Sequence, residues 1–153
     1  MDAVKVTTVV LEKPLTVVGK MFTGDYANSP AYVTEVQKEL ETQFIPFVPY
    51  KVMGVYYDNP QTTPAAELKS FQGVFVQDEG ANINEPLTRL SLQGNYLYVR
   101  ATGEPMKAIY EGYGALFSYI QAKSLTLESP AGYQVSTFEN GGITTEIYME
   151  IAE

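Results

Sequence analysis

The sequence contains neither cysteine nor histidine among its 153 residues. The lack of cysteine excludes disulfide bonds and thiol nucleophiles, and the lack of histidine excludes mechanisms that use an imidazole base. Zinc sites are usually built from these two residues, so we expect no metal, and no motif calls for a cofactor. A cysteine-free chain is compatible with a reducing compartment, and we expect a cytoplasmic location.

Basic residues and long apolar runs are also scarce. Lys and Arg together number 10 against 18 Asp and Glu, which gives a formal net charge of -8. Proteins that bind a phosphate backbone need clustered Lys and Arg, so we expect no direct contact with nucleic acid. No run approaches the length of about eighteen apolar residues that a membrane helix needs, so no membrane span is predicted.

The order of predicted elements is present twice. One copy covers about residues 4–77 and the other about residues 87–152, and each reads as strand, helix, strand and strand. A chain of this length supports one core, so we predict a single α+β domain over residues 1–153. Its duplicated β-α-β-β repeats are predicted to form a pseudo-symmetric antiparallel sheet, with two helices on one face and a ligand cleft between the halves.

Local patterns give the expected bounds. In the first copy, Lys13-Pro14 is predicted to separate two strands, and Asn28-Ser29 to precede a helix. The elements predicted there are strands 4–12, 17–23, 52–57 and 68–77, and helix 30–44. In the second copy Gln93-Gly94-Asn95 resembles a hairpin turn. The elements predicted there are strands 87–92, 96–101, 133–138 and 143–151, and helix 105–123.

The last predicted strand carries the acidic candidate. Its residues alternate in type, so Ile147 and Met149 are predicted to face the helices, and Glu146 and Tyr148 the opposite side. A glutamate among aromatic rings can neutralise an organic cation, or act as an acid or base. The alternative is a solvated glutamate that discourages edge pairing.

Aromatic residues are abundant, with 12 Tyr and 7 Phe but no Trp. Tyrosine suits pocket walls because its ring packs on apolar groups while its hydroxyl fixes orientation, although it is also common in half-buried strands. On helix 105–123 the aromatic residues exceed one helical face, so we expect some of them to contact something other than the core. They are Tyr110, Tyr113, Phe117 and Tyr119.

Several short motifs, taken in order, resemble one known family. They are Val18-Gly19, Thr23-Gly24-Asp25-Tyr26, the run from Met53 to Pro60, and the run from Glu146 to Ile151. Together they resemble the GyrI-like small-molecule-binding domain, which also forms the effector-binding part of AraC-type and MerR-type transcription regulators. The resemblance implies multidrug binding, with a pocket glutamate at Glu146 that faces lipophilic cations. One branch of the family resembles hydrolases of strained, cyclopropane-bearing genotoxins, and a eukaryotic relative serves as an adaptor.

Three hypotheses follow. The leading one is a module for lipophilic or cationic small molecules, in which Glu146 supplies charge and aromatic residues form the walls: Tyr56 or Tyr57, Phe75, Tyr110, Tyr113, Phe117 and Tyr148. The second is a hydrolase in which Glu146 activates water and Tyr113 or Tyr148 is the acid. The third is a protein-interaction adaptor that binds a separate regulator or other protein through a sheet edge or the loop 78–86.

Overall fold

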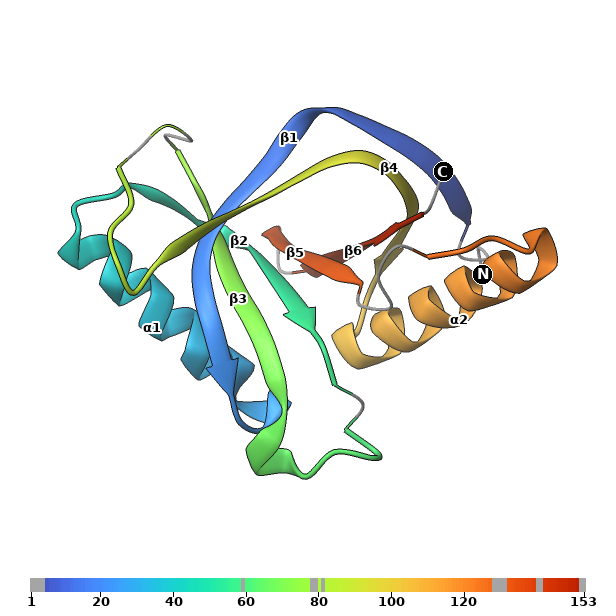
Figure 1. The fold of residues 1–153 in the computed structure, drawn as a ribbon, viewed down its shortest axis with the longest axis horizontal. Coiled ribbons are helices and arrows are strands. Elements are labelled where there is room, and N and C mark those ends of the chain that lie inside the picture. Colours follow the sequence, from blue (N-terminus) through green and yellow to red (C-terminus); the bar gives the residue numbers. More distant parts are fainter. Residues whose placement is uncertain are drawn as a thin grey trace. The chain divides into compact units, whose positions relative to one another are not determined.

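Figure 1 shows the chain in a computed structural model that describes residues 5–58, 60–77, 80, 82–127, 132–139 and 142–151. These residues form two α-helices and six β-strands, which confirms the α+β class. The chain divides into two compact units. We call residues 15–92 the N-terminal unit, and residues 93–153 together with residues 1–14 the C-terminal unit.

The N-terminal unit is a three-stranded antiparallel sheet with one helix. Strand β3 is central and pairs with both β1 and β2. Helix α1 places Val36 and Leu40 against Val18 and Val74 of the sheet. The remaining elements are two short 3₁₀ helices, η1 and η2. The bounds are β1 (Val6–Thr23), η1 (Tyr26–Asn28), α1 (Ser29–Thr42), β2 (Phe47–Tyr56), η2 (Ala65–Glu67) and β3 (Lys69–Val76).

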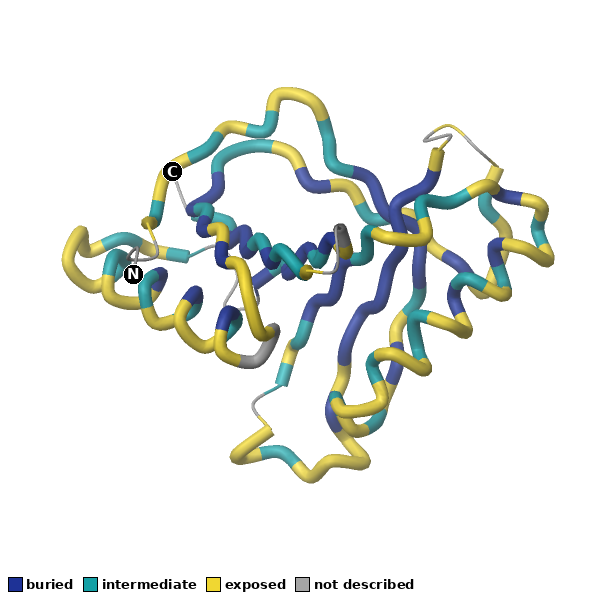
Figure 2. The backbone as a smooth tube through the Cα atoms, turned by 180° about the vertical axis from the view of Figure 1, so that it is seen from behind, coloured by how far each residue is buried: buried dark blue, intermediate teal, exposed yellow. Residues whose placement is uncertain are grey.

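The C-terminal unit has the same order of elements. Its central strand is β6, which pairs antiparallel with β4 and β5. Helix α2 packs Leu116 against Leu97 and Ile147. In Figure 2 both helices are buried along one side and exposed along the other, as expected for amphipathic helices. The bounds are β4 (Thr88–Thr102), α2 (Pro105–Lys123), β5 (Tyr133–Glu139) and β6 (Gly142–Glu150).

Two predicted interruptions are wrong. Strand β1 continues through Lys13-Pro14, and strand β4 continues through Gln93-Gly94-Asn95, where a hairpin turn was predicted. The structure accommodates Gly94 inside the strand at φ 108°, a value that glycine adopts without strain. Both positions coincide with the places where the chain passes from one unit to the other.

The loop from β2 to β3 is closed by side chains at its base. The Tyr26 hydroxyl accepts a hydrogen bond from the Asp58 backbone N–H at 2.9 Å and donates to the Lys69 carbonyl at 2.8 Å. The Asp58 carboxylate accepts one from the Lys69 N–H at 2.7 Å. Asp58, which belongs to the run from Met53 to Pro60, therefore helps to link the end of β2 to the start of β3. Asn59 lies outside the described residues, as do residues 78, 79 and 81 of the predicted loop 78–86.

A close approach fixes α2 on its sheet. A Cβ added to Gly112 would lie 2.8 Å from Ile147 Cδ1, so a larger residue would require the Ile147 side chain to shift. At Gly114 a Cβ would meet no atom within 4 Å. Among the residues that the structure describes, neither helix is long and apolar enough to cross a membrane.

Candidate functional site

The alternation predicted for β6 is confirmed. Ile147 and Met149 belong to the apolar cluster beneath α2, together with Leu116 of that helix. Because successive side chains of a strand point to opposite sides, Glu146 and Tyr148 face away from α2. The candidate site therefore lies on the face of this three-stranded sheet that α2 does not cover.

A tyrosine of the neighbouring strand holds the Glu146 carboxylate. The Tyr98 hydroxyl donates a short hydrogen bond to Glu146 Oε2. The strand register places Tyr98 directly opposite Tyr148, and Arg100 opposite Glu146. Among the described residues, no ion pair within 4.0 Å involves Glu146, although Arg100 shares its face of the sheet. The hydrogen-bond partner of this half-buried carboxylate is therefore a neutral phenol.

Four tyrosines form a continuous aromatic strip beside Glu146: Tyr96, Tyr98, Tyr133 and Tyr148. The Tyr148 ring lies 5.0 Å from that of Tyr98 and 6.1 Å from that of Tyr96, measured between centroids. Tyr133 contacts Tyr96 edge to face at 6.2 Å. Rings in such edge-on and tilted arrangements attract one another and present both ring faces and hydroxyl groups to a neighbour.

The tyrosines beside Glu146 are held in the neutral form. Burial raises the pKa of Tyr98, and the hydrogen bond to Glu146 and the charge of that carboxylate raise it further. Burial also raises the pKa of Tyr148 to about 12, with a further contribution from Glu146. A phenol beside a carboxylate resists ionisation because the second negative charge would be repelled. Where the strip adjoins Glu146, the negative charge therefore lies on the Glu146 carboxylate and the tyrosines are neutral.

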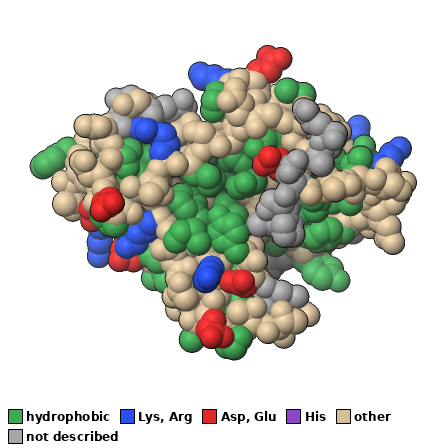
Figure 3. Space-filling model, viewed as in Figure 1, with side chains coloured by type: hydrophobic (Ala, Val, Ile, Leu, Met, Phe, Trp, Pro, Cys, Tyr) green, Lys and Arg blue, Asp and Glu red, His purple; other side chains and the backbone are tan. Residues whose placement is uncertain are grey.

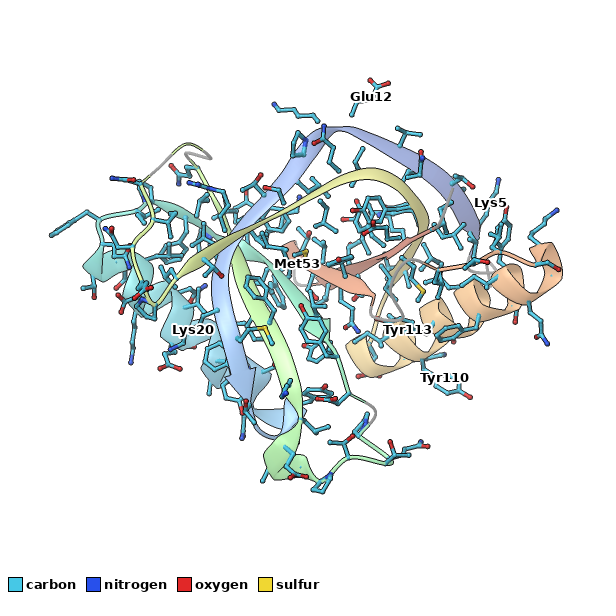
Figure 4. The ribbon with its side chains drawn as sticks, in the orientation of Figure 1. Lys5, Glu12, Lys20, Met53, Tyr110 and Tyr113 are labelled. Carbon is cyan, nitrogen blue, oxygen red and sulfur yellow. The ribbon has the colours of Figure 1, made fainter. Side chains whose placement is uncertain are left out.

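The predicted wall residues of α2 lie elsewhere. Tyr113 packs against the cluster beneath α2, and its hydroxyl accepts a hydrogen bond from Gln134 at 2.9 Å. Gln134 alternates with Val135, which pairs with Glu146, so Tyr113 and Glu146 lie on opposite faces of the sheet. Phe117 stacks on Tyr113 at 6.0 Å and is half exposed. Tyr110, labelled with Tyr113 in Figure 4, is 81% exposed.

The three candidates of the N-terminal unit are divided between the two faces of its sheet. Tyr56 lies on the side of α1, where its ring contacts Tyr26 and its hydroxyl donates to Ser29 at 3.4 Å. Phe75 is nearly buried on the other face, beneath the ammonium group of Lys51 at 4.6 Å. Tyr57 follows β2 and is exposed.

Sequence reasoning missed three members of the strip: Tyr96, Tyr98 and Tyr133. The alternation of Tyr96 and Tyr98 places both on one face of a strand, and this signal was available. It does not show that β4 pairs with β6 in the register that sets Tyr98 beside Glu146.

Elsewhere in the described residues, charged side chains form ion pairs at Lys20–Glu35 and Lys107–Glu111. On the face shown in Figure 3 the described Lys and Arg side chains are spread over several places and do not gather in one large patch. In the described part of the chain, no group of three or more acidic side chains is placed to hold a metal ion.

A comparison with protein families identifies the class to which the chain belongs. Residues 6–152 match the GyrI-like small molecule binding domain, and the chain belongs to this family. It is therefore a small-molecule-binding domain. A comparison with curated proteins gives no match.

The chain is also similar to solved structures of two other proteins, EcmrR and SAV2435. The chain is similar to the C-terminal domain of EcmrR, with 12% identity, a TM-score of 0.73 and 98% of each chain covered. It is also similar to EcmrR in a DNA complex, with 13% identity and a TM-score of 0.72. That match covers 99% of this chain and 58% of the EcmrR chain. A third match is SAV2435 bound to tetraphenylphosphonium, with 16% identity and a TM-score of 0.54. It covers 99% of this chain and 94% of the SAV2435 chain. At these identities the likeness shows the fold.

Proposed function

We propose that this domain binds lipophilic organic cations, with Glu146 as the counter-charge and the aromatic strip as the binding surface. The observation that carries the proposal is the half-buried Glu146 carboxylate, which has a phenol as its hydrogen-bond partner and lies among tyrosine rings. A carboxylate removed from water is costly unless an opposite charge or several donors compensate it. A delocalised organic cation supplies that charge and loses little hydration when it binds.

The rings favour the same ligand class. The face of an aromatic ring attracts cations, with contributions of about 0.5–2 kcal/mol for each contact. Because the pKa values of Tyr98 and Tyr148 are raised, both phenols stay neutral at physiological pH. Beside Glu146, a ligand therefore meets a carboxylate and uncharged rings. The relative SAV2435, which was solved with tetraphenylphosphonium, supports this choice of ligand class.

Arg100 is a competing charge that the ligand must tolerate. It lies opposite Glu146 in the strand register, but its side chain is exposed. Water and salt screen the field of an exposed guanidinium strongly. We infer that Arg100 weakens cation binding modestly and does not neutralise Glu146 in place of a ligand.

The geometry gives the hydrolase hypothesis less support. Tyr113, one of the two acids considered, lies on the other face of the sheet from Glu146. Tyr148 shares the face of Glu146, but a pKa of about 12 makes its phenol a weak acid at neutral pH. The predicted duplication, the cleft between the halves, and action through a separate regulator in the cytoplasm remain predictions.

Calorimetric titration with two triphenyl compounds tests the proposal. Methyltriphenylphosphonium carries a positive charge, and triphenylphosphine oxide is a neutral molecule of similar shape. Replacing Glu146 with Gln (Glu146→Gln) keeps the size of the side chain and removes its charge. We expect this variant to bind the phosphonium at least about tenfold more weakly, and the oxide within about twofold of the unchanged protein.

Glu111→Gln provides the matched control. Glu111 lies on α2, where it is exposed and pairs with Lys107 at 3.9 Å, on the other side of the sheet from the site. This variant loses the same charge and is expected to bind the phosphonium normally. Thermal unfolding verifies that both variants fold. If Glu146→Gln weakens the two compounds equally, charge does not determine binding and the proposal is wrong.

A further inference from the structure

A second carboxylate lies on the same face of β6 as Glu146. Glu150 follows Tyr148 by two residues and Glu146 by four, so alternation sets all three side chains on one side of the strand. Its partner in the strand register is Tyr96, just as Tyr98 is the partner of Tyr148. The family resemblance and the proposed binding site give no role to Glu150.

Each carboxylate is associated with a tyrosine of β4. Glu146 accepts the hydrogen bond from Tyr98. The pKa of Tyr96 is raised chiefly by burial of its ring. The negative charge of the nearby Glu150 raises it further. Tyr148 stands between the two pairs and contacts both rings. The aromatic strip thus has a carboxylate near each of two points along its length.

The separation of the two carboxylates follows from strand geometry. Four residues of an antiparallel strand, at about 3.4 Å each, place the two Cα atoms about 14 Å apart. Among the described residues, neither glutamate takes part in an ion pair within 4.0 Å. Two half-buried negative charges at this distance, with rings between them, match a molecule that carries two cationic groups joined by an apolar linker.

We propose that the site preferentially binds elongated dications, with one cationic group at Glu146, the other at Glu150, and the linker across Tyr148 and Tyr96. The inference rests on the proposed cation-binding function and specifies its ligand class. The second cationic group is delivered at high effective concentration once the first is bound, so it adds affinity without a second bimolecular step.

The linker is constrained by burial. Tyr148 and Tyr96 are only 8% and 3% exposed, so a ligand reaches these rings by displacing the side chains that cover them. A thin, flexible alkane linker displaces least. Matching the distance between its charges to that between the carboxylates is then the main determinant of affinity.

Chain-length dependence tests the proposal. The probes are α,ω-bis(trimethylammonium)alkanes with six, eight, ten and twelve methylenes, and decyltrimethylammonium is the single-headed reference. The ten-methylene linker spans roughly the separation of the two carboxylates. We expect this dication to bind about tenfold more tightly than decyltrimethylammonium, a difference of about 1.4 kcal/mol, and the six-methylene dication to show no gain.

Variants separate this inference from the proposal on which it rests. Glu150→Gln should bind the ten-methylene dication only as tightly as decyltrimethylammonium, and should leave the affinity for decyltrimethylammonium unchanged. Glu146→Gln should weaken both ligands, and Glu111→Gln neither. If decyltrimethylammonium binding depends on Glu146 but the dication gains nothing from Glu150, the inference is wrong and the proposed function stands. If neither ligand depends on Glu146, both fail.

Discussion

Replacing Tyr148 with phenylalanine should make the domain less sensitive to alkaline pH. The pKa of Tyr148 rises from 10.0 to about 12 in the folded chain because its ring is buried and lies near the Glu146 carboxylate. Below pH 10 the phenol is protonated in both states, and its contribution to stability is complete. Above pH 10 the unfolded chain releases the proton first, so stability falls as pH rises towards 12.

The size of the effect follows from the two pKa values. With one proton and a shift from 10.0 to about 12, the unfolded state gains about 1.4 kcal/mol over the folded state by pH 11 and about 2 kcal/mol by pH 12. The variant Tyr148→Phe has no proton to lose. Its free energy of unfolding should therefore fall less than that of the unchanged protein, by about 1.4 kcal/mol between pH 9 and pH 11.

Urea unfolding followed by far-ultraviolet circular dichroism at pH 9, 10 and 11 measures this difference. Comparing the two proteins at each pH cancels the titration of lysines and of the other tyrosines. Tyr110→Phe is the matched control, since it removes one hydroxyl from a ring that is 81% exposed on α2. Its difference from the unchanged protein should stay constant with pH. Parallel pH profiles for Tyr148→Phe and the unchanged protein would refute the reasoning.

Three further predictions concern backbone positions. Gly112→Ala should be less stable than Gly114→Ala by up to about 1 kcal/mol in urea, since the new Cβ would lie 2.8 Å from Ile147 Cδ1, which must shift, at the first position and in open space at the second. Equal stabilities would contradict this close approach. Gly19→Ala should cost about 3 kcal/mol, because its Cβ would lie 1.9 Å from a backbone carbonyl oxygen of β3, and a cost below about 1 kcal/mol would contradict that packing. Phe44→Gly should raise the free energy of unfolding by about 1 kcal/mol, because Phe44 follows the C-cap of α1 at φ 58° and is 92% exposed, and an unchanged thermal midpoint would count against this strain.

The sequence alone was sufficient for features that depend on one element. The alternation along β6 predicted which side chains face α2, and the structure agrees for Ile147, Met149 and Glu146. Such a pattern is reliable because a strand has only two faces and burial selects one of them. The long helix over residues 105–123 was predicted for a similar reason, from apolar residues repeated at helical spacing.

The errors arose where local signals conflict with long-range pairing. Pro14 and Gly94 are residues that end strands in most contexts, yet β1 and β4 pass through both positions. Beyond these positions, Val17–Thr23 of β1 pairs with β3 and Tyr96–Thr102 of β4 pairs with β6, and both pairings involve residues distant in sequence. Local propensity is a weak guide once such partners are available.

Tyr98 shows the same limit for the candidate site. Its hydrogen bond to Glu146, 48 residues away along the chain, depends on the pairing of β4 with β6. Tyr113 was predicted near Glu146 because an aromatic stripe on a helix does not show which rings turn towards the sheet. The structure places its hydroxyl beside Gln134 instead.

The closed base of the loop between β2 and β3 makes this loop a place to attach a reporter. Tyr26 and Asp58 join its two ends through hydrogen bonds, and the segment from Pro64 to Glu67 beyond them is exposed. The entropy of closing a loop grows only with the logarithm of its length, by about 0.6 kcal/mol for each doubling. A short tag or fluorophore-binding peptide inserted after Pro64 should therefore leave both strands paired, and would allow ligand binding to be followed optically without a substitution in the aromatic strip.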